Sequence, residues 1–88
     1  MEIQLLIKDD CAFCDDAKAI LDRLSADYGF SVRTIQLNSE DGQALAERAG
    51  VMFPPGILID GEPFSHGRPS ERKLRRELDR RIGLVRGP

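Results

Sequence analysis

The chain has 88 residues, of which 41% are hydrophobic and 32% charged, and its formal net charge is −2. These values are typical of one small globular domain, here residues 1–88, and argue against a disordered chain or several domains. No apolar run approaches the roughly 20 residues that span a bilayer, so we expect no membrane segment and no membrane partner.

The start of the chain indicates a cellular compartment. It lacks the basic leader of a secretory signal, and Lys8, Asp9 and Asp10 interrupt its first apolar run. We therefore expect a cytoplasmic protein. In that reducing compartment, two closely spaced cysteines are catalytic or metal-binding more often than structural.

The charges are unevenly distributed along the chain. Residues 1–67 contain 5 basic and 12 acidic side chains, whereas residues 68–88 contain 8 basic and 3 acidic ones. A basic segment attracts an acidic partner or nucleic acid, but no aromatic residues alternate with these arginines. We expect a solvated helix face that complements an acidic body, and no nucleic-acid binding.

The first half of the chain predicts a strand, a helix and a second strand. Alternating apolar residues over residues 2–7 favour a buried strand with helices on both sides of its sheet. Residues 12–28 form an amphipathic helix that ends at Gly29. Its apolar stripe comprises Cys14, Ala17, Leu21, Leu24 and Tyr28. Residues 30–37 favour a second strand, parallel to the first because a helix connects them.

A second helix and a hairpin follow. Asn38 or Ser39 caps a helix that ends at Gly50, and Gly42 within it costs about 1 kcal/mol relative to alanine, so we expect it to depend on packing. Residues 57–59 read as a buried strand. The pair Asp60-Gly61 predicts a tight turn into an antiparallel strand, which Pro63 places at an edge.

The last predicted element is a helix opened by Pro69 and Ser70. Its apolar stripe comprises Leu74, Leu78 and Ile82, and we expect it to end at Gly83, followed by a frayed tail. The predicted order is thus β-α-β-α-β-β-α, which belongs to the α/β class.

Cys11 and Cys14 are the only cysteines, and they stand where the first strand meets the first helix. This placement predicts a thiol–disulfide redox site. At a helix start, unpaired N–H groups and the helix dipole lower the pKa of the Cys11 thiol. Cys14 lies one turn later on the apolar stripe. We therefore expect Cys11 to attack a disulfide and Cys14 to resolve the mixed disulfide, with Phe13 lining the surface that a partner meets.

The neighbours of Cys11 act in opposite directions, since Asp9 and Asp10 repel a thiolate while Lys8 attracts it. Other readings of the pair also stay open. The cysteines could be structural, or the chain could be a non-catalytic interaction or metal-delivery module. A zinc site needs two further ligands and the chain offers only His66, so we expect no metal site within one chain. A copper-carrying domain would continue with a hairpin after its first helix. Here a second helix is predicted after the second strand, which argues against such a domain.

Several motifs together resemble a known family. They are Cys11-Ala12-Phe13-Cys14 after the first strand, Pro55 before Ile57-Leu58-Ile59-Asp60-Gly61, and Gly67 before the last helix. In this order they resemble the glutaredoxin type of the thioredoxin-fold superfamily, over nearly the whole chain. Residues 64–70 are also similar to the glutaredoxin-like redoxins that donate electrons to ribonucleotide reductase.

The resemblance implies a thioredoxin fold in its minimal glutaredoxin form, with a four-stranded mixed sheet and helices on both faces. It implies an oxidoreductase that reduces protein disulfides or mixed disulfides through its dithiol, and we expect the protein to be a monomer. No bound cofactor is expected. The electrons would come from an external reductant, either thioredoxin reductase with NADPH or glutathione.

The resemblance also assigns roles to residues near the cysteines. It implies that Pro55 is a cis-proline facing the pair, and that the residue before it holds the substrate backbone. Here that residue is Pro54, which has no N–H to donate, so we predict that glutathione is a poor reductant. In the loop around Gly67, Arg68 could hold a substrate carboxylate and His66 could assist proton transfer, although both could be plain exposed residues.

Overall fold

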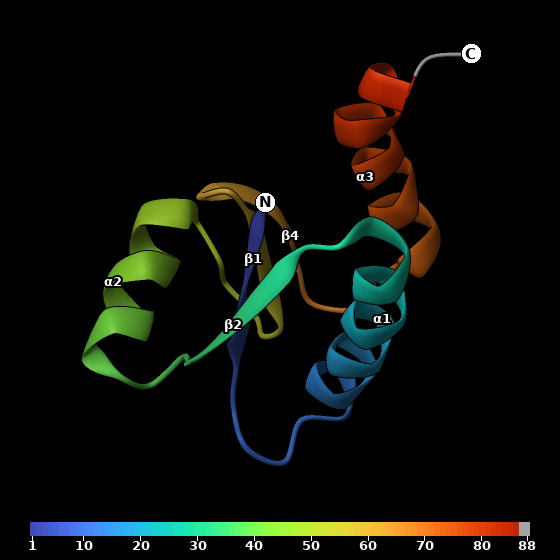
Figure 1. Cartoon of the computed structure of the whole chain (residues 1–88). Helices are drawn as coiled ribbons and strands as arrows, with labels where there is room; N and C mark the ends of the chain where they lie inside the picture. Colours follow the sequence, from blue (N-terminus) through green and yellow to red (C-terminus); the bar gives the residue numbers. More distant parts are fainter. Residues whose placement is uncertain (87–88) are drawn as a thin grey trace.

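The computed structural model of the protein describes residues 1–86, with side chains up to residue 82. Its elements follow the predicted order β-α-β-α-β-β-α (Figure 1). They are β1 (Glu2–Ile7), α1 (Ala12–Tyr28), β2 (Ser31–Gln36), α2 (Glu40–Ala49), β3 (Gly56–Ile59), β4 (Glu62–His66) and α3 (Glu71–Arg86). None of these helices combines the length and the apolar character that crossing a bilayer requires.

The four strands form one mixed sheet in the order β2-β1-β3-β4. β1 runs parallel to β2 and antiparallel to β3, and β4 returns antiparallel to β3. β4 is therefore an edge strand, as Pro63 predicted, and an irregularity in its pairing lies opposite residues 57 and 58. The tight turn before it holds Asp60 and Gly61 at φ values of 49° and 84°, the left-handed region that such turns require.

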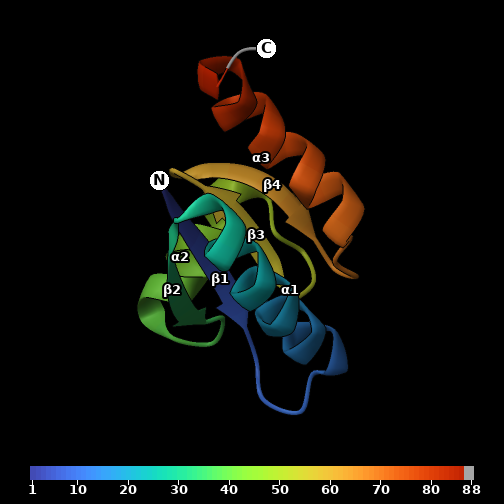
Figure 2. The ribbon, with the colours of Figure 1, turned by 45° about the vertical axis from the view of Figure 1, so that its right-hand side comes forward.

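The helices cover both faces of the sheet, as expected (Figure 2). One face contributes Ile3, Leu5 and Ile7 to a core that includes buried residues of α1 and α3. The opposite face contributes Leu6 and Leu58 to a smaller core against α2. The alternation along β1 separates these two cores, because successive side chains of a strand point to opposite faces.

Local capping explains where α1 and α2 begin and end. Gly29 and Gly50 follow the two helices at φ 72°, the conformation that glycine adopts at helix ends. The Ser39 hydroxyl accepts the N–H of Gly42 at 3.0 Å and caps α2. A Cβ atom on Gly42 would lie 1.9 Å from the carbonyl oxygen of Gln36, so α2 packs too closely on the end of β2 for any larger residue.

The end of α3 differs from the prediction. Ser70 caps its start through a 3.2 Å hydrogen bond from the N–H of Lys73, but the helix continues through Gly83 to Arg86. Gly83 does not stop it, because glycine lowers helix stability by about 1 kcal/mol yet keeps both backbone hydrogen-bonding groups. The predicted tail is therefore helical over residues 84–86, and residues 87–88 lie outside the described part of the chain.

Candidate functional site

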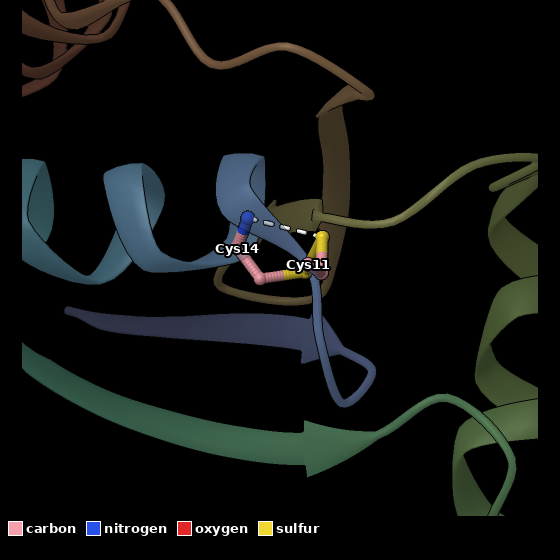
Figure 3. Close-up of a disulfide and its surroundings, with 2 residues drawn as sticks. All are labelled: Cys11 and Cys14. Carbon is pink, nitrogen blue, oxygen red and sulfur yellow. Dashed lines mark hydrogen bonds between the residues drawn. A yellow bond between two sulfur atoms is a disulfide. The ribbon is translucent and has the colours of Figure 1, made fainter.

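The two cysteines form a disulfide at the start of α1, just beyond the end of β1 (Figure 3). Cys11 has extended backbone angles and is the N-cap residue of the helix. Its sulfur accepts a 3.1 Å hydrogen bond from the N–H of Cys14, and its carbonyl oxygen accepts the N–H of Asp15. The sulfur of Cys11 thus satisfies one of the free N–H groups of the first helical turn.

The two sulfur-bearing residues differ in their access to solvent. Cys14 is 1% exposed and belongs to the core that α1 shares with the sheet, together with Ala17 and Ile57. Cys11 is only partly buried and packs against the edge of that core. An incoming sulfur atom can therefore reach Cys11 much more readily than Cys14.

The loop before β3, residues 50–55, is called the proline loop here because it contains Pro54 and Pro55. It lies at the same end of the sheet as the two cysteines. The peptide bond between Pro54 and Pro55 is cis, as the resemblance implied. Leu6 pairs with Gly56, so Pro55 comes level with the end of β1, from which the chain turns to Cys11. Figure 3 draws the start of β3 beside the disulfide. The ring of Pro55 is fully buried, which fixes this edge of the site.

Gly67 connects this proline loop to the end of β4. Its N–H donates to the carbonyl oxygens of Phe53 and Pro55, at 3.1 and 3.0 Å. Next to it, the His66 ring stacks on Phe53 with 6.2 Å between the ring centroids, and its Nδ1 accepts the N–H of Met52. The sequence-predicted residues Pro55 and Gly67 are therefore in direct contact, and His66 supports the loop.

Exposed apolar side chains stand on the segments that carry the site. Phe13, between the cysteines, is 45% exposed, and Met52 and Phe53, before the two prolines, are 73% and 62% exposed. Exposed aromatic residues of this kind commonly mark a surface for a partner. Sequence reasoning found Phe13 and missed Met52 and Phe53, although an apolar pair directly before two prolines was visible.

Arg68 lies between α1 and α3, one residue after Gly67, and lines two hollows. It is exposed and lines a hollow with Asp16 and Arg23 of α1 and a second one with α3. Its guanidinium forms no ion pair among the described side chains. Among the described side chains, no three His, Cys, Asp or Glu residues come together as they would in a metal site.

Comparisons with known proteins agree with this geometry. The sequence model of the glutaredoxin family matches residues 3–64, which include both cysteines and Pro55. No curated protein matches the sequence. These findings, with the cysteine pair at the start of α1, support a redox function.

Solved structures of similar fold include thioredoxins. Thioredoxin 1 from Thermosipho africanus TCF52B has a TM-score of 0.74 at 13% identity, over 99% of this chain and 100% of that one. A mutant thioredoxin from Halobacterium salinarum NRC-1 has a TM-score of 0.69 at 23% identity, over 90% of this chain and 72% of that one. At such identities the likeness establishes the thioredoxin fold alone.

Proposed function

The chain belongs to the glutaredoxin family, and on that premise we propose that it is a dithiol–disulfide oxidoreductase that reduces protein disulfides or mixed disulfides. The main support is the unequal burial of the pair: Cys11 meets solvent at the start of α1, whereas Cys14 lies 1% exposed behind it. We further propose that it acts in the cytoplasm as a monomer, with disulfide-containing proteins and a reductase as partners.

The reaction begins with the reduced protein. The thiolate of Cys11 attacks one sulfur of the substrate disulfide, a new S–S bond forms, and the other substrate sulfur leaves and takes a proton. Cys14 then loses its proton and attacks the Cys11 sulfur, which releases the second substrate thiol. The substrate has gained two electrons and two protons, and the protein is left with the Cys11–Cys14 disulfide.

The start of α1 assists the first of these steps. The N–H of Cys14 points at the Cys11 sulfur from 3.1 Å, and the helix dipole adds positive potential at the same place. Both favour negative charge on Cys11, which is the attacking group in the first step and the leaving group when a second thiol of the reductant breaks the mixed disulfide between the reductant and Cys11. The backbone of the helix therefore stabilises the reactive form of Cys11.

We propose that thioredoxin reductase with NADPH, rather than glutathione, supplies the electrons. Pro54 cannot donate a backbone hydrogen bond to a peptide laid beside Pro55, and its carbonyl oxygen can only accept one. We expect slow turnover with glutathione and glutathione reductase, and faster turnover with thioredoxin reductase and NADPH. Efficient reduction by the glutathione system alone would contradict this assignment.

The experiment that tests the proposed function is trapping with Cys14→Ser. This variant keeps the attacking thiol and lacks the resolving one, so the mixed disulfide with a substrate protein should accumulate on Cys11. The matched control is Cys11→Ser, which should trap almost nothing because Cys14 is buried. If neither variant traps a protein and the wild type reduces no disulfide, the chain is a non-catalytic interaction or metal-delivery module instead.

A further inference from the structure

The positive charges of α3 are divided between two sides of the helix. On the side that faces α1, Arg75 binds Asp27 at 3.3 Å, and Glu71 binds Arg23 of α1 at 2.6 Å. Near the hairpin, Arg81 binds Glu62 at 2.7 Å. Arg75 and Arg81 thus pair basic groups of the helix with acidic groups of the body, as the sequence indicated, whereas Glu71 and Arg23 pair in the opposite sense.

The side of α3 that faces β4 is different. There a groove of about 500 Å³ lies between the two elements, which run alongside each other in Figure 2. Its positively charged lining residues are Arg68, Lys73, Arg76 and Arg80. The last three recur at intervals of three and four residues, so they share one side of the helix. Among the side chains that the structure describes, Arg68, Lys73 and Arg76 form no ion pair.

Among the described lining residues, Glu77 is the one carboxylate beside these cations. It accepts hydrogen bonds from Arg80 at 2.5 Å and from Arg81 at 2.8 Å, which together lower its pKa to about 2. Its charge is thus already balanced by two arginines. The other three cations of the groove keep an excess of positive charge that nothing in the described structure neutralises.

One end of the groove adjoins the loop that carries Phe53 and Pro55. His66, one of its lining residues, stacks on Phe53, and the adjacent Gly67 binds the carbonyl oxygen of Pro55. A polypeptide whose disulfide meets Cys11 can therefore continue from the proline loop past His66 and along α3. The acidic remainder of the protein, with 12 acidic and 5 basic side chains in residues 1–67, would repel an acidic segment elsewhere.

We propose that the groove between β4 and α3 binds an acidic segment that flanks the disulfide of the substrate protein. This inference rests on the proposed function and adds a substrate class to it. The groove offers guanidinium and ammonium groups for carboxylates, and only one carboxylate of its own. Nucleic acid fits it less well, because the Phe64 ring packs against the core and the His66 ring already stacks on Phe53, so neither ring is free to stack on bases.

The test uses two disulfide-bonded peptides that differ only in a flank of glutamates or of glutamines. For each protein variant, the ratio of kcat/KM for the acidic peptide to that for the neutral one is measured. We expect a ratio of about ten or more for the wild type, and a ratio near or below one for Lys73→Glu with Arg76→Glu. The matched control is Arg33→Glu with Arg48→Glu, which changes the net charge equally on β2 and α2 and should keep the wild-type ratio.

A second variant makes the charge of the groove more positive and should change the ratio in the opposite direction. Glu77→Gln removes the negative charge of Glu77 from the groove and frees Arg80, while Arg81 keeps its ion pair with Glu62, so the ratio should rise several-fold above the wild-type value. A wild-type ratio near one would overturn the inference. So would a ratio that changes equally in the groove and control variants, since only the total charge would then matter.

A binding measurement separates this inference from the proposed function. The acidic peptide with serine in place of cysteine is titrated into Cys11→Ser, Cys14→Ser protein by calorimetry. If the peptide binds and the substitutions Lys73→Glu and Arg76→Glu abolish that binding, the assigned role of the groove is supported even if no disulfide is reduced. If the wild type reduces bis(2-hydroxyethyl) disulfide but no such binding is found, the proposed oxidoreductase function stands and the binding role of the groove is refuted. Groove-dependent binding of a single-stranded oligonucleotide, but not of the peptide, would also overturn the inference.

Discussion

The sulfur of Cys11 accepts the backbone N–H of Cys14 at 3.1 Å and serves as the N-cap of α1. Serine, threonine, aspartate and asparagine usually take this position, because their side-chain oxygens accept such a bond. Here a sulfur atom does so, and the capping interaction and the redox chemistry share one atom. The helix start therefore supports negative charge on the residue that is more open to solvent.

This relationship predicts unequal reactivity of the two thiols. In single-cysteine proteins at neutral pH, the free thiol in Cys14→Ser should react with iodoacetamide at least about tenfold faster than that in Cys11→Ser, because it is more exposed and capped by an N–H. Mass spectrometry of timed samples gives both rates. Equal rates, or faster modification of Cys14, would contradict the division of roles between the two cysteines.

The contacts between α1 and α3 predict a specific loss of stability. Arg75 binds Asp27 and lies 5.8 Å above the Tyr28 ring. Arg75→Ala should lower the free energy of unfolding slightly but measurably, since it removes an exposed ion pair and a cation–π contact together. Chemical denaturation measures the change. The control is Arg72→Ala on the same helix, whose exposed side chain forms no ion pair in the described structure, and a loss as large there would contradict the assignment.

The sequence predicted most of the fold because its signals were local. The start and end of α1 were predicted from the position of Cys11 and from Gly29, and the hairpin from Asp60 and Gly61. These residues act through their own backbone angles or through hydrogen bonds to near neighbours. The predicted end of α3 was wrong because Gly83 was taken as a helix stop. A glycine inside a helix only lowers helix stability modestly, and α3 continues to Arg86.

The site was predictable only in part, for a similar reason. Cys11 and Cys14 are recognisable in the sequence by their spacing, whereas the net charge of the groove depends on which arginines form ion pairs. Arg75 pairs with a residue 48 positions away, and Arg81 with one 19 positions away. The sequence alone does not distinguish the arginines that form ion pairs from those that do not. The contact of Gly67 with Phe53 likewise depends on tertiary structure.

Gly42 predicts the reverse of the usual effect of alanine in a helix. Replacing an interior glycine by alanine ordinarily adds about 1 kcal/mol of stability. Gly42→Ala should instead lower the free energy of unfolding by roughly 1–3 kcal/mol, because the added Cβ would lie 1.9 Å from the Gln36 carbonyl oxygen. Thermal and chemical denaturation check this, with Glu47→Ala on the exposed side of α2 expected to change little. A stabilised Gly42→Ala protein would refute the close packing of α2 on β2.

The ion pairs of Glu77 predict an acid-dependent contribution to stability. Arg80 and Arg81 lower the pKa of this carboxyl from its ordinary value of 4.5 to about 2 in the folded protein. Because the folded pKa is depressed, the stabilisation is fully present above about pH 4.5 and disappears as the pH falls towards 2. Glu77→Gln should thus cost about 1 kcal/mol at pH 7 and almost nothing near pH 2. Denaturation curves at several pH values measure the difference, and a difference independent of pH would contradict these pairs.

The most direct measurement of the central claim compares the reduction of a disulfide-bonded protein by wild type and by Cys11→Ser, Cys14→Ser protein. Both are assayed with dithiothreitol as the electron source, beside a sample without added protein. The wild type should accelerate the reduction many-fold, and the double variant should match the sample without protein. If the double variant accelerates the reaction as well as the wild type, or the wild type does not accelerate it, the chain is not a dithiol oxidoreductase.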